Sequence, residues 1–122
     1  MKINCGTDII EIERIKKAIE NVGDKFISRV FTESEIEYCE SKKGQKYQHY
    51  AARFAAKEAT YKAIAERISK SWTWKSFEVV KSENGKPCMK VDCDIADLES
   101  LDISISHCKE YAVATVVAQF FK

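Results

Sequence analysis

The chain of 122 residues has little of what marks membrane, disulfide-rich or disordered proteins. It contains one proline and four glycines, and we find no linker, repeat or low-complexity run. No apolar stretch approaches the length of a membrane span, and Asp8 interrupts the short apolar run near the N-terminus, so we expect neither a signal peptide nor a membrane partner. The composition, 45% hydrophobic and 32% charged, is that of a globular protein, and the length predicts a single domain over 1–122.

The chain also lacks an excess of charge and a cysteine framework. A net charge of +1 excludes a general affinity for polyanions, so no nucleic-acid partner is expected and any acidic partner must meet a local patch. The five cysteines are odd in number and have no C-x-x-C spacing, which argues against disulfide pairing and a zinc cage. Free thiols indicate a reducing compartment, and we expect the protein to be cytoplasmic.

The pattern of apolar residues predicts helices first and then strands, with one strand at the start. Alternation predicts a strand over 3–9, and a 3.6-residue period predicts a helix that ends at Gly23. Thr32 and Glu35 form a capping box for a helix to about Ser41, and a long helix is expected over 47–66. Strands follow after residue 70 in "FEVVKS", "PCMKVDC", "DISIS" and "YAVATVVAQF", and Asn84-Gly85 predicts a hairpin with a type I′ turn. The fold class is therefore α+β, with helices packed on a mainly antiparallel sheet.

The long helix has an unusual distribution of charge. At about 100° per residue, one face holds only alanines, so another backbone can approach it closely: Ala52, Ala55, Ala56, Ala59 and Ala63. Glu58 and Lys62 lie on another face, beside Phe54 and Tyr61. An acidic side chain in this apolar company needs compensation. Lys62 alone could provide it through a purely structural ion pair.

A metal–phosphate site is the alternative reading of the same helix. Carboxylates hold Mg²⁺, which keeps several waters and binds substrate phosphates, and Arg53, Lys57 and Lys62 could neutralise phosphate oxygens. A single carboxylate is a poor Mg²⁺ site, and Asp8 is the candidate for the second ligand. The alternative for Asp8 is a capping role at the following helix.

Four segments together resemble a known family, the phosphopantetheinyl transferases. They are "GTD" (6–8), "FAAKEATYKA" (54–63), "NGKP" (84–87) and "ISISH" (103–107), and with the chain length they match the short holo-acyl-carrier-protein synthase type. The resemblance implies the fold of that family. It also implies transfer of 4′-phosphopantetheine from coenzyme A to a serine of apo acyl carrier protein, for fatty acid biosynthesis, with release of adenosine 3′,5′-bisphosphate. It further implies a Mg²⁺ requirement and a homotrimer with active sites at subunit interfaces.

The resemblance also assigns roles to individual residues. It implies that Asp8 and Glu58 bind the metal and that Asp8, Glu58 and Lys62 are catalytic, with Lys62 stabilising the leaving group. The serine's proton could go to a metal-bound water or to a carboxylate, and the sequence leaves this open. The residues implied in coenzyme A binding are Arg53, Lys57, Lys62, Asn84, Gly85, Lys86, Pro87 and His107.

Each of the coenzyme A residues has a simpler alternative. Arg53 and Lys57 are expected at the 3′-phosphate or diphosphate, or else on a solvated helix face. His107 is expected at the phosphates across an interface, although a lone histidine at a strand end is more often a surface residue. Residues 84–87 are expected along the adenine and ribose, or as an ordinary turn. His49 matches no motif and is taken as structural or surface.

A basic flank on the first helices is expected to dock the acidic carrier protein through electrostatic steering. Its alternative is a set of solubilising charges, since acidic residues are interspersed. It comprises Arg14, Lys17, Asn21, Lys25, Phe26 and Arg29. The 67–76 segment departs from the family by lacking glycine, and Trp72 and Trp74 could begin a strand or plug an interface.

Two rival functions remain at this level. The first is a coenzyme A or nucleotide-binding module without catalysis. The second is a structural homo-oligomer or adaptor whose charged helix is only a salt-bridged core.

Overall fold

The computed structural model describes all residues from 1 to 122 and contains four α-helices and five strands. The strands are β1 (Lys2–Glu11), β2 (Phe77–Lys81), β3 (Pro87–Val91), β4 (Leu98–His107) and β5 (Tyr111–Phe120). The helices are α1 (Ile12–Val22), α2 (Asp24–Val30), α3 (Glu33–Glu40) and α4 (Lys46–Ile64), with 3₁₀ turns η1 (Lys43–Gln45) and η2 (Trp74–Ser76). The predicted α+β class is confirmed.

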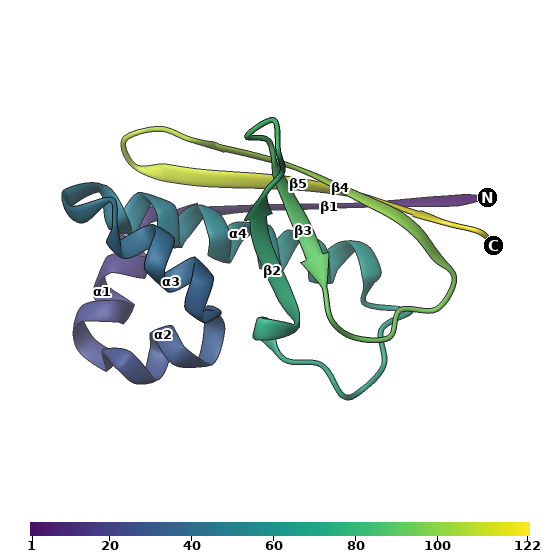
Figure 1. Ribbon diagram of the computed structural model, residues 1–122, viewed down its shortest axis with the longest axis horizontal. Coiled ribbons are helices and arrows are strands. Elements are labelled where there is room, and N and C mark those ends of the chain that lie inside the picture. The colour runs from purple at the N-terminus through teal and green to yellow at the C-terminus, as the bar shows by residue number, and fades with distance from the viewer.

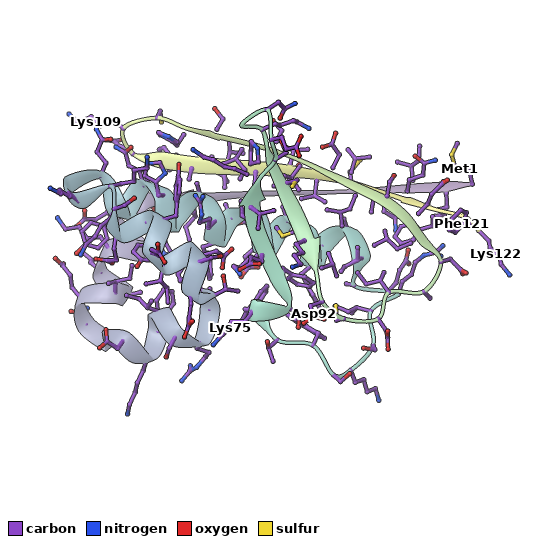
Figure 2. The ribbon with its side chains drawn as sticks, in the orientation of Figure 1. Met1, Lys75, Asp92, Lys109, Phe121 and Lys122 are labelled. Atoms are coloured by element: carbon purple, nitrogen blue, oxygen red, sulfur yellow. The ribbon has the colours of Figure 1, made fainter.

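The main sheet is antiparallel and has the strand order β1-β5-β4, and β2 and β3 form a separate hairpin. Helix α4 runs along the sheet, and α1–α3 gather at the end where β4 turns into β5 (Figure 1). Lys109 in that turn lies at the opposite end of the sheet from Met1 and Phe121 (Figure 2). The first strand is longer than predicted, and it enters helix α1 directly.

The alanine face of α4 packs on the main sheet. Ala55, Ala56, Ala59 and Ala63 are buried in one cluster with inward residues of β5 such as Ala114, Val116 and Ala118, and Ala52 is buried in the neighbouring cluster. The approach is so close that a Cβ at Gly6 of β1 would overlap the carbonyl oxygen of Ala59. Any larger residue at this position would push α4 away from β1. The close approach predicted from the alanines is therefore confirmed, and it fixes α4 against Asp8, two residues after Gly6.

The small helices form a second apolar cluster with the start of α4. The stripe predicted for α1 buries Ile12, Ile15 and Ile19, and the chain turns at Gly23, whose φ of 74° favours glycine. The capping box of α3 is present: Thr32 Oγ1 accepts from Glu35 N at 3.3 Å, and Glu35 Oε1 accepts from Thr32 N at 2.9 Å. The segment 24–30 is helical, which the sequence reading did not anticipate.

The β2–β3 hairpin forms where predicted, but its turn is not type I′. A type I′ turn needs positive φ at both central residues, and Gly85 has it whereas Asn84 does not. The connection is longer: Ser82 N donates to Lys86 O and Gly85 N donates to Ser82 O. The Asn84 side chain stabilises this loop by accepting from Lys86 N at 3.0 Å. Its Oδ1 atom is therefore engaged within the turn.

The segment before the hairpin is held by aromatic packing. Trp72 stacks on Tyr61 of α4 with ring centroids 4.8 Å apart and on Phe77 at 5.5 Å. Trp74 lies in the 3₁₀ turn η2 and packs 6.5 Å from Phe54. The prediction that the tryptophans begin a strand is wrong, because they cover the end of the core beside α4.

The outer face of the main sheet has no covering element. Its apolar residues are exposed, including Ile3, Ile9, Tyr111 and Val117, with Ile9 at 64%. The five cysteines are free thiols. Among the helices, none combines the length and the apolar character that crossing a membrane requires.

Candidate active site

The predicted acidic pair lies where α4 crosses β1. Lys62 Nζ donates to Asp8 Oδ1 at 3.1 Å and to the Thr7 carbonyl at 3.0 Å. Glu58, one turn earlier on α4, takes part in no ion pair or hydrogen bond. The structural ion pair considered for Glu58 and Lys62 is therefore not formed, because Lys62 pairs with Asp8. Asp8 does not cap α1 either, because no side chain caps that helix.

Glu58 is a partly buried carboxylate that has no ion-pair partner. Partial burial and the negative charge of Asp8 raise the pKa of Glu58, and the charge of Lys62 offsets only part of that rise. No group of three or more histidine, cysteine or acidic side chains is present that could form a closed metal cage. Two oxygen ligands on rigid elements suit Mg²⁺, which usually binds through one or two carboxylates together with waters and substrate phosphates.

A second charged cluster surrounds the ring of Tyr38 on α3. The Arg53 guanidinium carbon lies 4.1 Å from the ring centroid, and the Nζ atoms of Lys42 and Lys81 each lie 4.8 Å from it. His49 packs against the same ring at 5.4 Å and against the His107 ring at 6.1 Å. We call these five basic side chains the Tyr38 cluster; they are Lys42, His49, Arg53, Lys81 and His107.

The Tyr38 cluster has no carboxylate partner. None of Lys42, Arg53 and Lys81 forms a salt bridge, and Arg53 is only 7% exposed with its Nε lacking a hydrogen-bond partner. Burial lowers the pKa of His49, and the positive charges of Arg53, Lys42, His107 and Lys81 lower it further. A buried donor without an acceptor among several cations is suited to receive a dianionic ligand such as a phosphate.

The two clusters lie on different sides of α4. Arg53 and Glu58 are five residues apart, which is about 7.5 Å along the axis and about 140° around it. Lys62 reaches towards β1, whereas Arg53 packs on α3. One chain therefore presents an acidic metal-type site and a basic phosphate-type site as separate features.

Lys57 does not join either cluster, contrary to expectation. It is fully buried, with Nζ 2.8 Å from Glu35 Oε1, and it donates to the backbone carbonyls of Trp74 (3.0 Å) and Phe77. Glu35 also accepts from Val79 N at 2.8 Å. These bonds connect α3, α4 and the start of β2. Because its three donors are used inside the core, Lys57 cannot reach a coenzyme A phosphate in this structure.

The hairpin residues lie at the surface. Lys86 Nζ donates to Asp102 Oδ1 of β4 at 2.6 Å, which fastens the hairpin tip to the main sheet. Asn84, Gly85 and Lys86 are exposed and Pro87 is half-buried.

The predicted docking flank is mostly exposed. Arg14, Lys17, Asn21, Lys25 and Arg29 are all exposed, and none of the four basic residues forms a salt bridge. Phe26, in contrast, is half-buried and packs 6.3 Å from Phe31 and 6.2 Å from Phe54.

Sequence reasoning missed Lys42, Lys81 and Tyr38, and it set His49 aside. His49 and Arg53 are one turn apart on α4, so their shared face could have been read from the sequence. Lys42 and Lys81 come from other segments and are brought there only by the fold.

The fold and the two clusters define a class: a small α+β protein with a pair of carboxylates on one side of its long helix and a group of basic side chains on another. The chain belongs to the 4′-phosphopantetheinyl transferase superfamily, whose model matches residues 4–116, and within it to the holo-[acyl-carrier-protein] synthases. The protein of that name from Ruminiclostridium cellulolyticum is 49% identical over 96% of this chain and 92% of its own length.

Solved structures agree with this assignment. The holo-(acyl-carrier-protein) synthase of Bacillus anthracis, in complex with CoA (3′,5′-ADP), has a TM-score of 0.78 and 39% identity, with 94% of each chain covered. The Helicobacter pylori enzyme in complex with coenzyme A has a TM-score of 0.81 and 33% identity, covering 94% of this chain and 99% of that one.

Proposed function

We propose that this chain transfers 4′-phosphopantetheine from coenzyme A to a serine of apo acyl carrier protein. The observation that carries the proposal is the unpaired, partly buried Glu58 beside Asp8 and Lys62, in a chain of this family. The reaction joins the serine oxygen to the phosphorus that bears the pantetheine. The bond from that phosphorus to the neighbouring phosphate breaks, and adenosine 3′,5′-bisphosphate and the serine proton leave.

Asp8 and Glu58 are the proposed ligands of Mg²⁺. When bound, the ion neutralises negative charge on the diphosphate during transfer. Both carboxylates must be ionised to hold it, and since burial and the charge of Asp8 raise the pKa of Glu58, a bound cation would stabilise its charged form. The two carboxylates are therefore held close together before a cation binds, and their repulsion lowers the stability of the metal-free fold.

Lys62 is the proposed stabiliser of the leaving group. Its side chain is 50% exposed and its amine is oriented by Asp8 and Thr7, so it can place a positive charge beside a diphosphate oxygen. Such transfer depends on positioning and charge neutralisation rather than on a nucleophile supplied by the enzyme. The nucleophile belongs to the carrier protein.

The Tyr38 cluster is the proposed site for a phosphate group of coenzyme A. Arg53 and His107 are members of it, in agreement with the roles that the family resemblance implies. Its lack of carboxylate partners and the free Nε of Arg53 support this assignment. Residues 84–87 remain candidates for contact with the adenosine.

We propose further that the active protein is a homotrimer, with each site completed by two copies. The separation of the two clusters around α4 and the exposed apolar face of the sheet both support this arrangement. In such an assembly the acidic site of one copy would meet the Tyr38 cluster of the next.

The exposed flank of α1 and α2 is the proposed docking site for the acidic carrier protein. Its basic residues are free of intramolecular ion pairs and can steer the partner. Phe26 contributes through its half-exposed ring, and it connects this flank to Phe54 on α4.

Intact-mass spectrometry tests the proposed function. Apo acyl carrier protein is incubated with the chain, coenzyme A and Mg²⁺, with EDTA in a parallel sample. The expected result is a gain of one phosphopantetheine mass that EDTA abolishes. No gain with several carrier proteins, despite coenzyme A binding, would favour a binding module without catalysis.

A further inference from the structure

Three cations of the Tyr38 cluster, Arg53, Lys42 and Lys81, lie against the ring of Tyr38. Arg53 comes from α4, Lys42 from the loop after α3, and Lys81 from the end of β2. Each places its charged group within 5 Å of the centroid of the Tyr38 ring. These three residues remain cationic at neutral pH, and no carboxylate pairs with any of them.

Like charges gathered in this way repel one another, so something must hold them together before an anion binds. The faces of an aromatic ring carry negative partial charge and attract lysine and arginine at these distances. The ring of Tyr38 is itself held by the edge of His49 and by its position in α3. Lys42 in the α3–α4 loop and Lys81 at the end of β2 are thereby oriented towards Arg53.

The pKa of the Tyr38 hydroxyl is also affected by these nearby cations. Burial by itself raises the pKa of Tyr38, but interaction with Lys81 and the charges of Arg53 and Lys42 outweigh it, so the pKa is lowered overall. The ring therefore lies in a strongly positive environment. The buried Nε of Arg53 still lacks an acceptor there.

We propose that Tyr38 is a positioning residue of the enzyme, whose ring holds Arg53, Lys42 and Lys81 in the geometry that receives a phosphate of coenzyme A. The inference rests on the proposed transfer reaction and deepens it by adding Tyr38, Lys42 and Lys81 to the substrate site. Tyr38 acts through the three cations: the face of its ring attracts all of them, whereas its hydroxyl interacts with Lys81 alone.

Calorimetric binding of coenzyme A to the intact protein tests this role separately from catalysis. Tyr38→Phe keeps the ring and should bind coenzyme A within about twofold of the unmodified chain. Tyr38→Leu removes it and should weaken binding about tenfold or more, because three cation contacts are lost together. In transfer assays, the KM for coenzyme A should rise with kcat nearly unchanged.

Tyr47 provides a matched control. It is also half-buried, and its ring lies 5.6 Å from Lys16 Nζ and 5.4 Å from Lys46 Nζ, away from the Tyr38 cluster. Tyr47→Leu should leave coenzyme A binding unchanged. If Tyr38→Leu does not fold, Lys42→Ala and Lys81→Ala replace it, since each should weaken binding about threefold.

A comparison with 3′-dephospho-coenzyme A identifies the phosphate. Weakening confined to coenzyme A assigns the cluster to the 3′-phosphate, and equal weakening for both ligands assigns it to the diphosphate. Either result supports the role of Tyr38. Unchanged binding in Tyr38→Leu, or in both lysine variants, would overturn it, as would an equal loss in Tyr38→Phe or Tyr47→Leu. Binding without transfer by the unmodified chain would refute the proposed function while leaving this test intact.

Discussion

Lys57 and Lys62 lie five residues apart on α4, but replacing them by methionine should have different effects. Lys57→Met should mainly lower the stability of the fold, whereas Lys62→Met should mainly lower the rate of transfer. Lys57→Met removes the partner of a carboxylate that is 1% exposed and leaves the carbonyls of Trp74 and Phe77 without their donor. Breaking a fully buried ion pair from one side costs about 3–5 kcal/mol. For a chain of this length, that corresponds to a fall in Tm of about 10–20 °C.

Lys62→Met is the matched control. Its ion pair with Asp8 is half-exposed on the lysine side, so its loss should cost no more than about 1 kcal/mol. Transfer, however, should fall by about 10²–10³-fold, because the charge beside the leaving group is lost. Urea denaturation followed by circular dichroism measures the first effect, and intact-mass assays measure the second.

A double variant separates the ion pair from the packing of Lys57. Glu35→Gln together with Lys57→Met removes both charges, and the amide oxygen still accepts from one of the two backbone donors, Thr32 N or Val79 N, which in the native chain bond to different oxygens of Glu35. It should be more stable than the sum of the single variants predicts, with a coupling of about 1–3 kcal/mol. Unchanged stability of Lys57→Met combined with a raised KM for coenzyme A would refute this reasoning and restore Lys57 to the substrate site.

Three further predictions concern the metal ligands, the docking flank and the assembly. Burial and Asp8 raise the pKa of Glu58 above its unfolded value near 4.5. The metal-free chain should therefore lose stability as the pH rises from about 4.5 to the raised pKa of the folded state. Glu58→Gln should remove that loss in denaturation series and should also abolish transfer; an unchanged pH profile would contradict the assignment. Arg14→Glu should raise the KM for the carrier protein about threefold to tenfold without affecting that for coenzyme A, and equal effects would exclude docking there. Light scattering should give about three subunits for the unmodified chain and one for Ile9→Asp, which puts a charge on the exposed sheet face; a fully active monomer would disprove the trimer.

Local rules predicted the parts of the fold that depend on neighbouring residues. The capping box at Thr32, the end of α1 at Gly23 and the alanine face of α4 each follow from a few adjacent positions, and all three are confirmed. The type I′ turn predicted at Asn84 followed the same kind of rule and is wrong, because the connection runs from Ser82 to Lys86 and the Asn84 side chain bonds within it.

Other side-chain positions depend on contacts between segments that are far apart in the sequence, and these could not be predicted from local patterns. Lys57 and Lys62 are both lysines on α4. Lys57 is accommodated in the core because Glu35, 22 residues earlier in the chain, forms a buried ion pair with it. Lys42 and Lys81 likewise reach Tyr38 from segments with no local signal. The metal-type pair was found because a family resemblance supplied a long-range connection between residues 8 and 58.

Subunit mixing tests most directly the central claim, a transferase whose sites are completed by two copies. Asp8→Asn chains and Arg53→Gln chains are unfolded together, refolded as an equal mixture and assayed by the intact mass of the carrier protein, at a coenzyme A concentration low enough that the Arg53→Gln chain alone transfers little. If each site draws Asp8 from one copy and Arg53 from its neighbour, about one quarter of the sites in random assemblies are intact, and activity should return to about that fraction. Activity no higher than that of either variant alone would contradict the account.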